Sequence, residues 1–308
     1  MREGGTTLHD GTSKEMEGWA SRIQDSVQGQ VPAQTEPIPP PGEPPHPRVH
    51  RHTDFASRFL PGERDVSVYV PPGYGEESGR RYPLLILHDG QNLFDPATSF
   101  IPGKTWRVAE NADDAIAAAE AEPLVIAGVA NAGERRLAEY TPTRDWKLGG
   151  GEASKYEQLV TRELLLFLHE RYRLRSGPAD TGIGGSSLGG LVSLWMGLRH
   201  PGVFGKLAVL SPSVWWNQRY ILAYLSDLAP ELHRRARIWL DVGDKEGRRT
   251  LADAELLHTR LRAHGWRNGT DLHFEIAIGG SHDEASWAER VRPMLRFLFP
   301  ARGTGHSK

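Results

Sequence analysis

Apolar runs of strand length alternate along this chain with segments in which apolar residues recur at helical spacing. The predicted strands cover residues 49–57, 65–70, 82–87, 124–130, 181–185, 206–210, 237–242 and 272–278. The predicted helices cover residues 155–172, 219–228, 251–264 and 284–299, and a further helix runs from the segment after Ser187 to the stop at His200-Pro201. This alternation indicates an α/β fold with a doubly wound, mostly parallel sheet and helices on both faces. No helical insertion is long enough to form a large cap domain, so an open active site is expected.

The N-terminal part has a different character. It combines a weak amphipathic helical pattern over residues 14–27 with a proline-rich stretch over residues 38–47. Proline cannot continue a helix or join a central strand, so this stretch is interpreted as a semi-rigid linker. The predicted organisation is therefore an extension and linker over residues 1–47, one α/β domain over residues 48–302, and a disordered tail over residues 303–308.

The segment Gly185-Ser186-Ser187-Leu188-Gly189 fits G-x-S-x-G where a predicted strand turns into a predicted helix. This context is typical of a nucleophile elbow, in which the central serine projects its hydroxyl above the sheet. Small neighbours are required because the strand and the helix nearly touch, and glycines provide them. The frame centred on Ser186 fails, since it would place Leu188 where a glycine is needed. Ser187 is therefore the candidate nucleophile.

A serine hydroxyl needs a histidine base and an orienting carboxylate to attack near neutral pH. In hydrolases with this elbow, the acid and then the histidine follow the serine on loops after later strands. Glu246 lies after the strand over residues 237–242, and His282 lies after the strand over residues 272–278. Asp244, at the end of the same strand as Glu246, is the alternate acid. A structural alternative makes His282 a helix cap and Glu246 one solvated charge among many.

The oxyanion that forms during attack on an ester needs two backbone N–H donors. Leu188, the residue after the nucleophile, is expected to supply one. The second is expected from the loop after the strand over residues 82–87, where Gly90 lets the backbone turn into the site. This predicts the N–H of Gln91 as the second donor. His88, just before this turn, is expected to be buried and structural.

Composition and charge exclude several classes of function. Lys and Arg total 37 against 39 Asp and Glu, and the formal charge of −2 gives no reason to expect nucleic acid or an anionic membrane as a partner. The absence of cysteine excludes disulfides, thiolate metal sites and cysteine catalysis. Phosphate-loop and H-E-x-x-H motifs are absent, and the histidines at 46, 50 and 52 are interpreted as a surface cluster rather than as a metal site. With no signal-peptide or spanning segment, a cytoplasmic location is the default expectation, and a misassigned start would leave export open.

Six blocks, in order along the chain, resemble a known family. They are His88-Asp-Gly-Gln-Asn-Leu-Phe-Asp-Pro, Glu139-Tyr-Thr-Pro, Gly184-Gly-Ser-Ser-Leu-Gly-Gly, Ser211-Pro-Ser, Asp241-Val-Gly-Asp-Lys-Glu-Gly and Gly279-Gly-Ser-His, with Trp287 after the last. From about Val49 to about Phe299 the chain is similar to the putative esterases, which include esterase D-like proteins, enterochelin esterases, and the feruloyl and acetylxylan esterases of carbohydrate esterase family 1. The resemblance implies an α/β-hydrolase fold, a serine carboxylic ester hydrolase with the triad Ser187, Glu246 and His282, and no metal or organic cofactor. The chain departs from the family's Gly-Thr-x-Glu acid block in having Asp244 in place of the threonine, which leaves Glu246 at the acid position.

The expected substrate is a small-molecule or carbohydrate ester, and the sequence leaves the oligomeric state unknown. Aromatic side chains near the carboxyl ends of the strands suit a flat acyl group, and arginines there suit an acidic or catecholate one. The candidate substrate contacts, which are equally candidates for packing helices onto the sheet, are Trp106, Arg135, Tyr140, Arg144, Trp215, Trp216 and Trp287. Two rival functions use the same scaffold: an acyltransferase with the same triad, and a non-catalytic binding protein.

Overall fold

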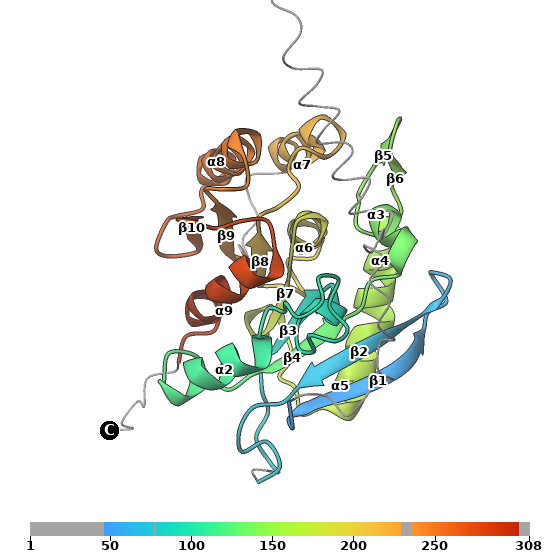
Figure 1. Cartoon of the computed structure of the whole chain (residues 1–308), viewed down its shortest axis with the longest axis vertical. Coiled ribbons are helices and arrows are strands. Elements are labelled where there is room, and N and C mark those ends of the chain that lie inside the picture. Colours follow the sequence, from blue (N-terminus) through green and yellow to red (C-terminus); the bar gives the residue numbers. More distant parts are fainter. Residues whose placement is uncertain (1–45, 77, 229–235, 302–308) are drawn as a thin grey trace, which may run out of the picture.

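The computed structural model describes residues 46–76, 78–228 and 236–301. Its centre is an eight-stranded sheet in the order β1-β2-β4-β3-β7-β8-β9-β10 (Figure 1). The strands are β1 (Val49–Ala56), β2 (Glu63–Tyr69), β3 (Leu84–His88), β4 (Val125–Val129), β7 (Thr181–Ser186), β8 (Lys206–Leu210), β9 (Arg237–Gly243) and β10 (Leu272–Ala277). Every end lies within two residues of its predicted position, which confirms the strand pattern.

Strand β2 runs antiparallel to both of its neighbours, and the strands from β4 to β10 in the sheet order are parallel. A parallel sheet is covered on both faces, so its strands are apolar throughout rather than alternating. In β3, for example, Leu84 and Ile86 join the core on one face, while Leu85 and Leu87 join the core on the other. The doubly wound fold predicted from the sequence is therefore confirmed.

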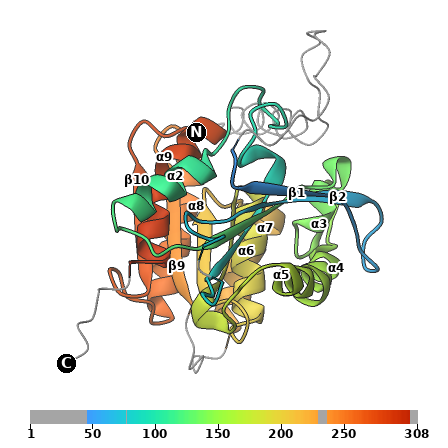
Figure 2. The same cartoon turned by 90° about the horizontal axis from the view of Figure 1, so that it is seen from below.

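The helices divide between these two faces. One face is covered by α4 (Ala153–Gln158), α5 (Leu165–Arg171), α6 (Leu188–Arg199), α7 (Trp216–Ser226) and α8 (Arg248–Ala263). The other is covered by α2 (Val108–Ala117) and α9 (Glu284–Leu298), which pack against each other. Figure 2 shows the two groups of helices on opposite sides of the sheet. None of the described helices is long and apolar enough to cross a membrane.

Several smaller elements were not predicted. Within the predicted helix over residues 155–172, a π-helical segment, η3 (Leu159–Leu164), joins α4 to α5, and the three form one continuous helix. The others are α2, α3 (Arg136–Glu139), the two-residue hairpin strands β5 (Arg144–Asp145) and β6 (Gly149–Gly150), and the 3-10 turns η1 (Gly90–Asn92), η2 (Gly133–Arg135) and η4 (Pro178–Asp180). The predicted helix over residues 14–27 and the tail over residues 303–308 lie outside the described residues, and the division into domains stays a prediction.

Sheet topology brings the candidate functional loops together. Because β3 lies between β4 and β7, the chain winds outward in both directions from this point. Ligands of open α/β sheets bind at the carboxyl ends of the strands near such a reversal. The loops that leave β3, β7, β8, β9 and β10 carry Gln91, Ser187, Ser211, Glu246 and His282, respectively.

Candidate active site

Ser187 occupies the sharp turn between β7 and α6. Its φ of 57° and ψ of −121° lie in a region that side chains rarely adopt. Ser187 N donates to Leu210 O at 3.0 Å, which ties the turn to β8. The glycines allow this geometry, because a Cβ built at Gly190 would come within 2.9 Å of Leu210 O, and one at Gly185 within 3.1 Å of the Gly189 backbone. This is the strained turn that the G-x-S-x-G pattern predicted.

His282, on the loop after β10, contacts Glu246, on the loop after β9. His282 Nδ1 and Glu246 Oε2 are 2.8 Å apart, and the Glu246 side chain is fully buried while that of His282 is 42% exposed. Among the described residues, Ser187 Oγ contacts Ser213 Oγ at 3.2 Å and is not hydrogen bonded to His282. The ring of Trp287 packs edge-on against His282, with ring centroids 4.9 Å apart.

The structure distinguishes the two carboxylates that the sequence left as alternatives. Asp244 Oδ1 accepts a hydrogen bond from Gly279 N at 2.8 Å, so this side chain holds the β10 loop rather than the histidine. Glu246 Oε1 accepts from Gly243 N and from Ser211 Oγ, both at 2.6 Å, while Oε2 faces His282. Burial opposes ionisation of Glu246, but these partners outweigh it and hold the pKa of Glu246 below its ordinary value.

The loop that carries Gln91 packs tightly against β4. A Cβ on Gly90 would lie 2.5 Å from the carbonyl carbon of Gly128, so only glycine fits there. Gln91 is the second residue of η1, and Leu188 is the first residue of α6. Backbone N–H groups in the first turn of a helix have no acceptor within that helix. Both predicted oxyanion donors therefore have N–H groups that their own helices leave unbonded.

Residues beside this loop fix its shape. Asp89 adopts a left-handed φ of 57°, and its carboxylate accepts two hydrogen bonds from Arg136, at 2.7 and 2.8 Å. Burial opposes ionisation of Asp89, but Arg136 and Asn131 lower its pKa below the ordinary value. His88 is fully buried as expected, its Nδ1 lies 2.9 Å from the Tyr156 hydroxyl, and burial lowers its pKa to about 4. It is therefore neutral near pH 7.

Most of the candidate substrate contacts have packing partners in the structure. The rings of Trp106, Tyr140, Trp216 and Trp287 are buried. Arg135 pairs with Glu139 and Glu152. Trp215 is half-buried and Arg144 is exposed. Substrate contact stays a prediction for all seven residues, and accessibility favours Trp215 and Arg144.

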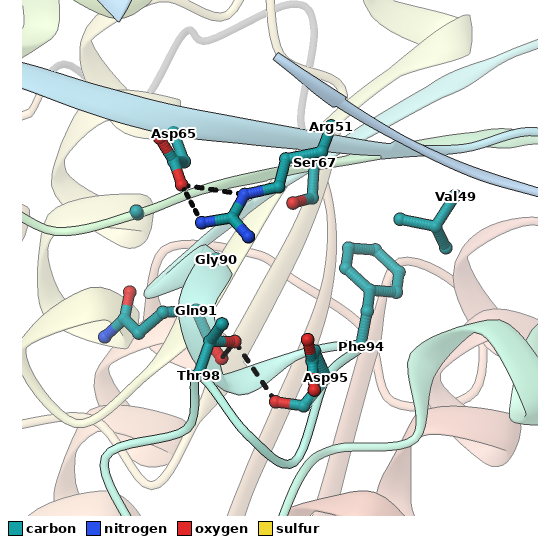
Figure 3. A pocket seen from close by; sticks show the side chains of 10 residues that line it. Val49, Arg51, Asp65, Ser67, Gly90, Gln91, Phe94, Asp95 and Thr98 are labelled. Atoms are coloured by element: carbon teal, nitrogen blue, oxygen red, sulfur yellow. Dashed lines mark hydrogen bonds and ion pairs between the residues drawn. The ribbon is translucent and has the colours of Figure 1, made fainter. Parts of the chain in front are cut away.

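A cavity lies between the loop that carries Gln91 and the strands β1 and β2 (Figure 3). Its volume is about 100 Å³, smaller than the roughly 300 Å³ at which ordinary ligand pockets begin. Arg51 and Asp65 form an ion pair in its wall. The residues that line it are Val49, Arg51, Asp65, Ser67, Gly90, Gln91, Phe94, Asp95, Thr98 and Ala130. Since neither Ser187 nor His282 lines it, this cavity is not the place where an ester would meet the serine.

The three N-terminal histidines divide between two different partners. His46 pairs with Asp113, and His50 and His52 both contact the Tyr172 hydroxyl. Among residues 46–76, 78–228 and 236–301, no group of three or more His, Cys, Asp or Glu side chains is arranged to hold a metal ion.

Three residues near the triad had no role assigned from the sequence. Ser211 and Ser213 contact Glu246 and Ser187, respectively, and Arg290 on α9 contacts both Ser211 and Glu246. The Ser211-Pro212-Ser213 block was visible as a motif after a strand, which was the one available signal. Arg290 carries no local signal, because its partners lie at least four residues away in the chain.

Comparison with known proteins identifies the family. A family model described as putative esterase matches residues 57–298. The chain belongs to the putative esterase family. As a family member, this esterase is a hydrolase. Its doubly wound α/β sheet agrees with the fold implied by the resemblance of its six sequence blocks.

Three similar proteins illustrate the relationship. The uncharacterized protein YbbA of Bacillus subtilis is 26% identical over 79% of this esterase and 95% of its own length. An endo-1,4-beta-xylanase/feruloyl esterase of Xylanibacter ruminicola is 23% identical over 76% of this chain and 29% of its own length. The enterobactin esterase FES of Shigella flexneri, solved in the presence of 2,3-dihydroxy-N-benzoyl-serine, superposes with a TM-score of 0.65 at 21% identity, covering 86% of this chain and 63% of its own. The last likeness shows a shared fold.

Proposed function

We propose that this esterase is a serine carboxylic ester hydrolase that acts through an acyl-Ser187 intermediate. The observation that carries the proposal is the 2.8 Å contact between His282 Nδ1 and the buried carboxylate of Glu246, at the same end of the parallel sheet as the strained turn of Ser187. A carboxylate that accepts the Nδ1 proton leaves Nε2 free to accept another. The histidine is then a base for the Ser187 hydroxyl.

The reaction requires the serine hydroxyl to turn from Ser213 towards His282. Catalytic hydrogen bonds often form only when substrate is bound. His282 takes the hydroxyl proton as Ser187 Oγ attacks the ester carbon, and the N–H groups of Leu188 and Gln91 stabilise the resulting oxyanion. His282 then gives the proton to the departing alcohol, and water releases the acid from Ser187 by the same steps.

The names of two relatives guide the choice of substrate class. One is named as a feruloyl esterase, and another was solved with a dihydroxybenzoyl-serine compound. We infer that the acid part of the substrate is aromatic and of small-molecule size. A panel of short p-nitrophenyl esters, hydroxycinnamate esters, acetylated xylan and trilactone siderophores tests this inference, and preference for the acetyl esters would contradict it. Products formed with added acceptor alcohols would reveal acyl transfer instead of hydrolysis.

The nucleophile is tested by two neighbouring serines. Ser187→Ala should lower kcat by several orders of magnitude and abolish labelling by a fluorophosphonate probe, because the acyl acceptor is gone. Ser186→Ala is the matched control, since Ser186 is the last residue of β7 and is buried. It should keep activity within about tenfold. Equal losses in the two variants would refute the assignment, and probe labelling of Ser187→Ala would refute the serine mechanism.

A further inference from the structure

The proposed mechanism gives no role to Ser211, the first residue of the Ser211-Pro212-Ser213 block. Ser211 follows β8 directly, is 1% exposed, and adopts a φ of 42°. A left-handed backbone costs free energy for a residue with a side chain, so the position is one where glycine would be easier to accommodate. An interaction that offsets the cost of this backbone conformation is therefore expected among the contacts of the Ser211 hydroxyl.

The hydroxyl has three partners, and two of them can only donate. Trp287 Nε1 and Arg290 Nη1 each lie 3.0 Å from Ser211 Oγ. Indole and guanidinium nitrogens carry no acceptor lone pair, so both must donate to the oxygen. The single hydroxyl proton is then directed to the third partner, Glu246 Oε1, at 2.6 Å. The direction of this hydrogen bond is thus determined by the surrounding donors.

This contact determines how the carboxylate of Glu246 is shared. Oε1 is occupied by Ser211 Oγ and by Gly243 N, with Arg290 Nη2 at 3.4 Å. Oε2 faces His282 Nδ1. Trp287, which donates to Ser211, also packs against the ring of His282. One hydroxyl therefore connects the acid to the residue that packs against the base.

We propose that Ser211 is a positioning residue of the triad: its hydroxyl, oriented by Trp287 and Arg290, fixes the Glu246 carboxylate so that Oε2 is presented to His282. This inference rests on the proposed function. It assigns to Ser211 an effect on turnover, because a carboxylate free to rotate would stabilise the imidazolium less well in the transition state. Substrate binding, in contrast, does not depend on this contact.

The backbone of Ser211 offers a sharp test. Ser211→Gly removes the hydroxyl and relieves the left-handed strain, whereas Ser211→Ala removes the hydroxyl and keeps the strain. Both variants should lose about 10- to 100-fold in kcat, as expected for a hydrogen bond to a charged group, with KM changed less than about threefold. The glycine variant should unfold at a urea concentration equal to or above that of the alanine variant, which separates turnover from stability.

Ser193→Ala is the matched control, since Ser193 is another fully buried serine, whose hydroxyl donates to Gly189 O within α6. It should keep kcat within about threefold. The low-field proton resonance of His282 Nδ1–H should move in the Ser211 variants and stay in place in Ser193→Ala, which a merely structural role would not produce.

A kcat loss below tenfold in Ser211→Gly, or a loss confined to KM, overturns the positioning role. Ser187→Ala distinguishes this failure from failure of the proposed function. An inactive Ser187→Ala beside an active Ser211→Gly refutes only the positioning role of Ser211. An active Ser187→Ala refutes the serine mechanism itself.

Discussion

Replacing Glu246 with glutamine should disable the histidine through its tautomer rather than through a change of shape. The Oε1 position of Glu246 receives donors from Ser211 Oγ and Gly243 N, so in the variant it must hold the amide oxygen. The amide NH₂ group then faces His282 Nδ1, which must become an acceptor. The imidazole proton moves to Nε2, the nitrogen that has to accept the proton of Ser187.

The opposite amide orientation offers no escape. It would aim the NH₂ group at the N–H of Gly243, 2.6 Å away in the parent protein, and leave buried donors without acceptors. Glu246→Gln should therefore lose both the correct tautomer and the negative charge that stabilises the imidazolium. The comparable change in a serine protease triad costs about 10⁴-fold in kcat, equivalent to about 5 kcal/mol of transition-state stabilisation. We expect a similar loss, with KM nearly unchanged.

Asp244→Asn is the matched control for this experiment. Its amide oxygen can still accept from Gly279 N, so kcat should stay within about tenfold of the parent value. The assay is steady-state hydrolysis of a p-nitrophenyl ester near neutral pH, with urea unfolding to verify that both variants are folded. More than about 10% residual kcat in Glu246→Gln would refute the donor argument. A large loss of kcat in Asp244→Asn would transfer the acid role to Asp244.

Two further predictions concern stability. Gly90→Ala would place a Cβ 2.5 Å from Gly128 C, a backbone atom that cannot move easily, so it should lower the free energy of unfolding by about 1–3 kcal/mol and lower kcat as the Gln91 loop shifts. Gly202→Ala is the control for urea unfolding, because no atom lies within 4 Å of its Cβ. Equal stabilities of the two variants would contradict the packing argument. Burial raises the pKa of Asp241 to about 6, so the folded protein binds the Asp241 proton more tightly than the unfolded chain does. This proton therefore contributes up to about 3 kcal/mol to the free energy of unfolding. The contribution is full below about pH 4 and is lost as the pH rises to about 6. Asp241→Asn is neutral throughout and should flatten that slope, so parallel pH profiles of the two unfolding free energies would contradict the shift.

The strands and the main candidate residues followed from short-range patterns. Runs such as Leu84 to Leu87 indicate a strand buried on both faces, and the order of Ser187, Glu246 and His282 places each on a loop at the same edge of the sheet. The preference for Glu246 over Asp244 came from the spacing of the family's acid block. The structure adds a physical reason, because Asp244 is engaged with Gly279.

Other features depend on contacts that no local pattern reveals. The aromatic candidates are an example. Trp106 and Trp287 pack against each other, with ring centroids 5.7 Å apart, and sequence periodicity cannot distinguish such packing from a surface that contacts substrate. No local pattern predicted the short helix α3 or the left-handed φ values of Asn217, Gln218 and Arg219 at the start of α7. At that start, Trp216 Nε1 donates to Thr143 O in the hairpin region and ties the two segments together.

The charges around Arg290 connect stability with the proposed chemistry. Arg290 is buried and faces two buried carboxylates, with Nη1 2.7 Å from Asp241 Oδ1 and Nη2 3.4 Å from Glu246 Oε1. With both carboxylates ionised, this cluster carries one uncompensated negative charge, and Glu246 Oε2 lies 2.8 Å from His282 Nδ1. Proton transfer from Ser187 to His282 would create a positive charge next to that oxygen, within a site whose groups are already fixed by Ser211 and Gly243. Fixed charges of this kind stabilise a developing charge without reorganisation, so the buried excess of carboxylate over guanidinium favours the imidazolium that the mechanism requires.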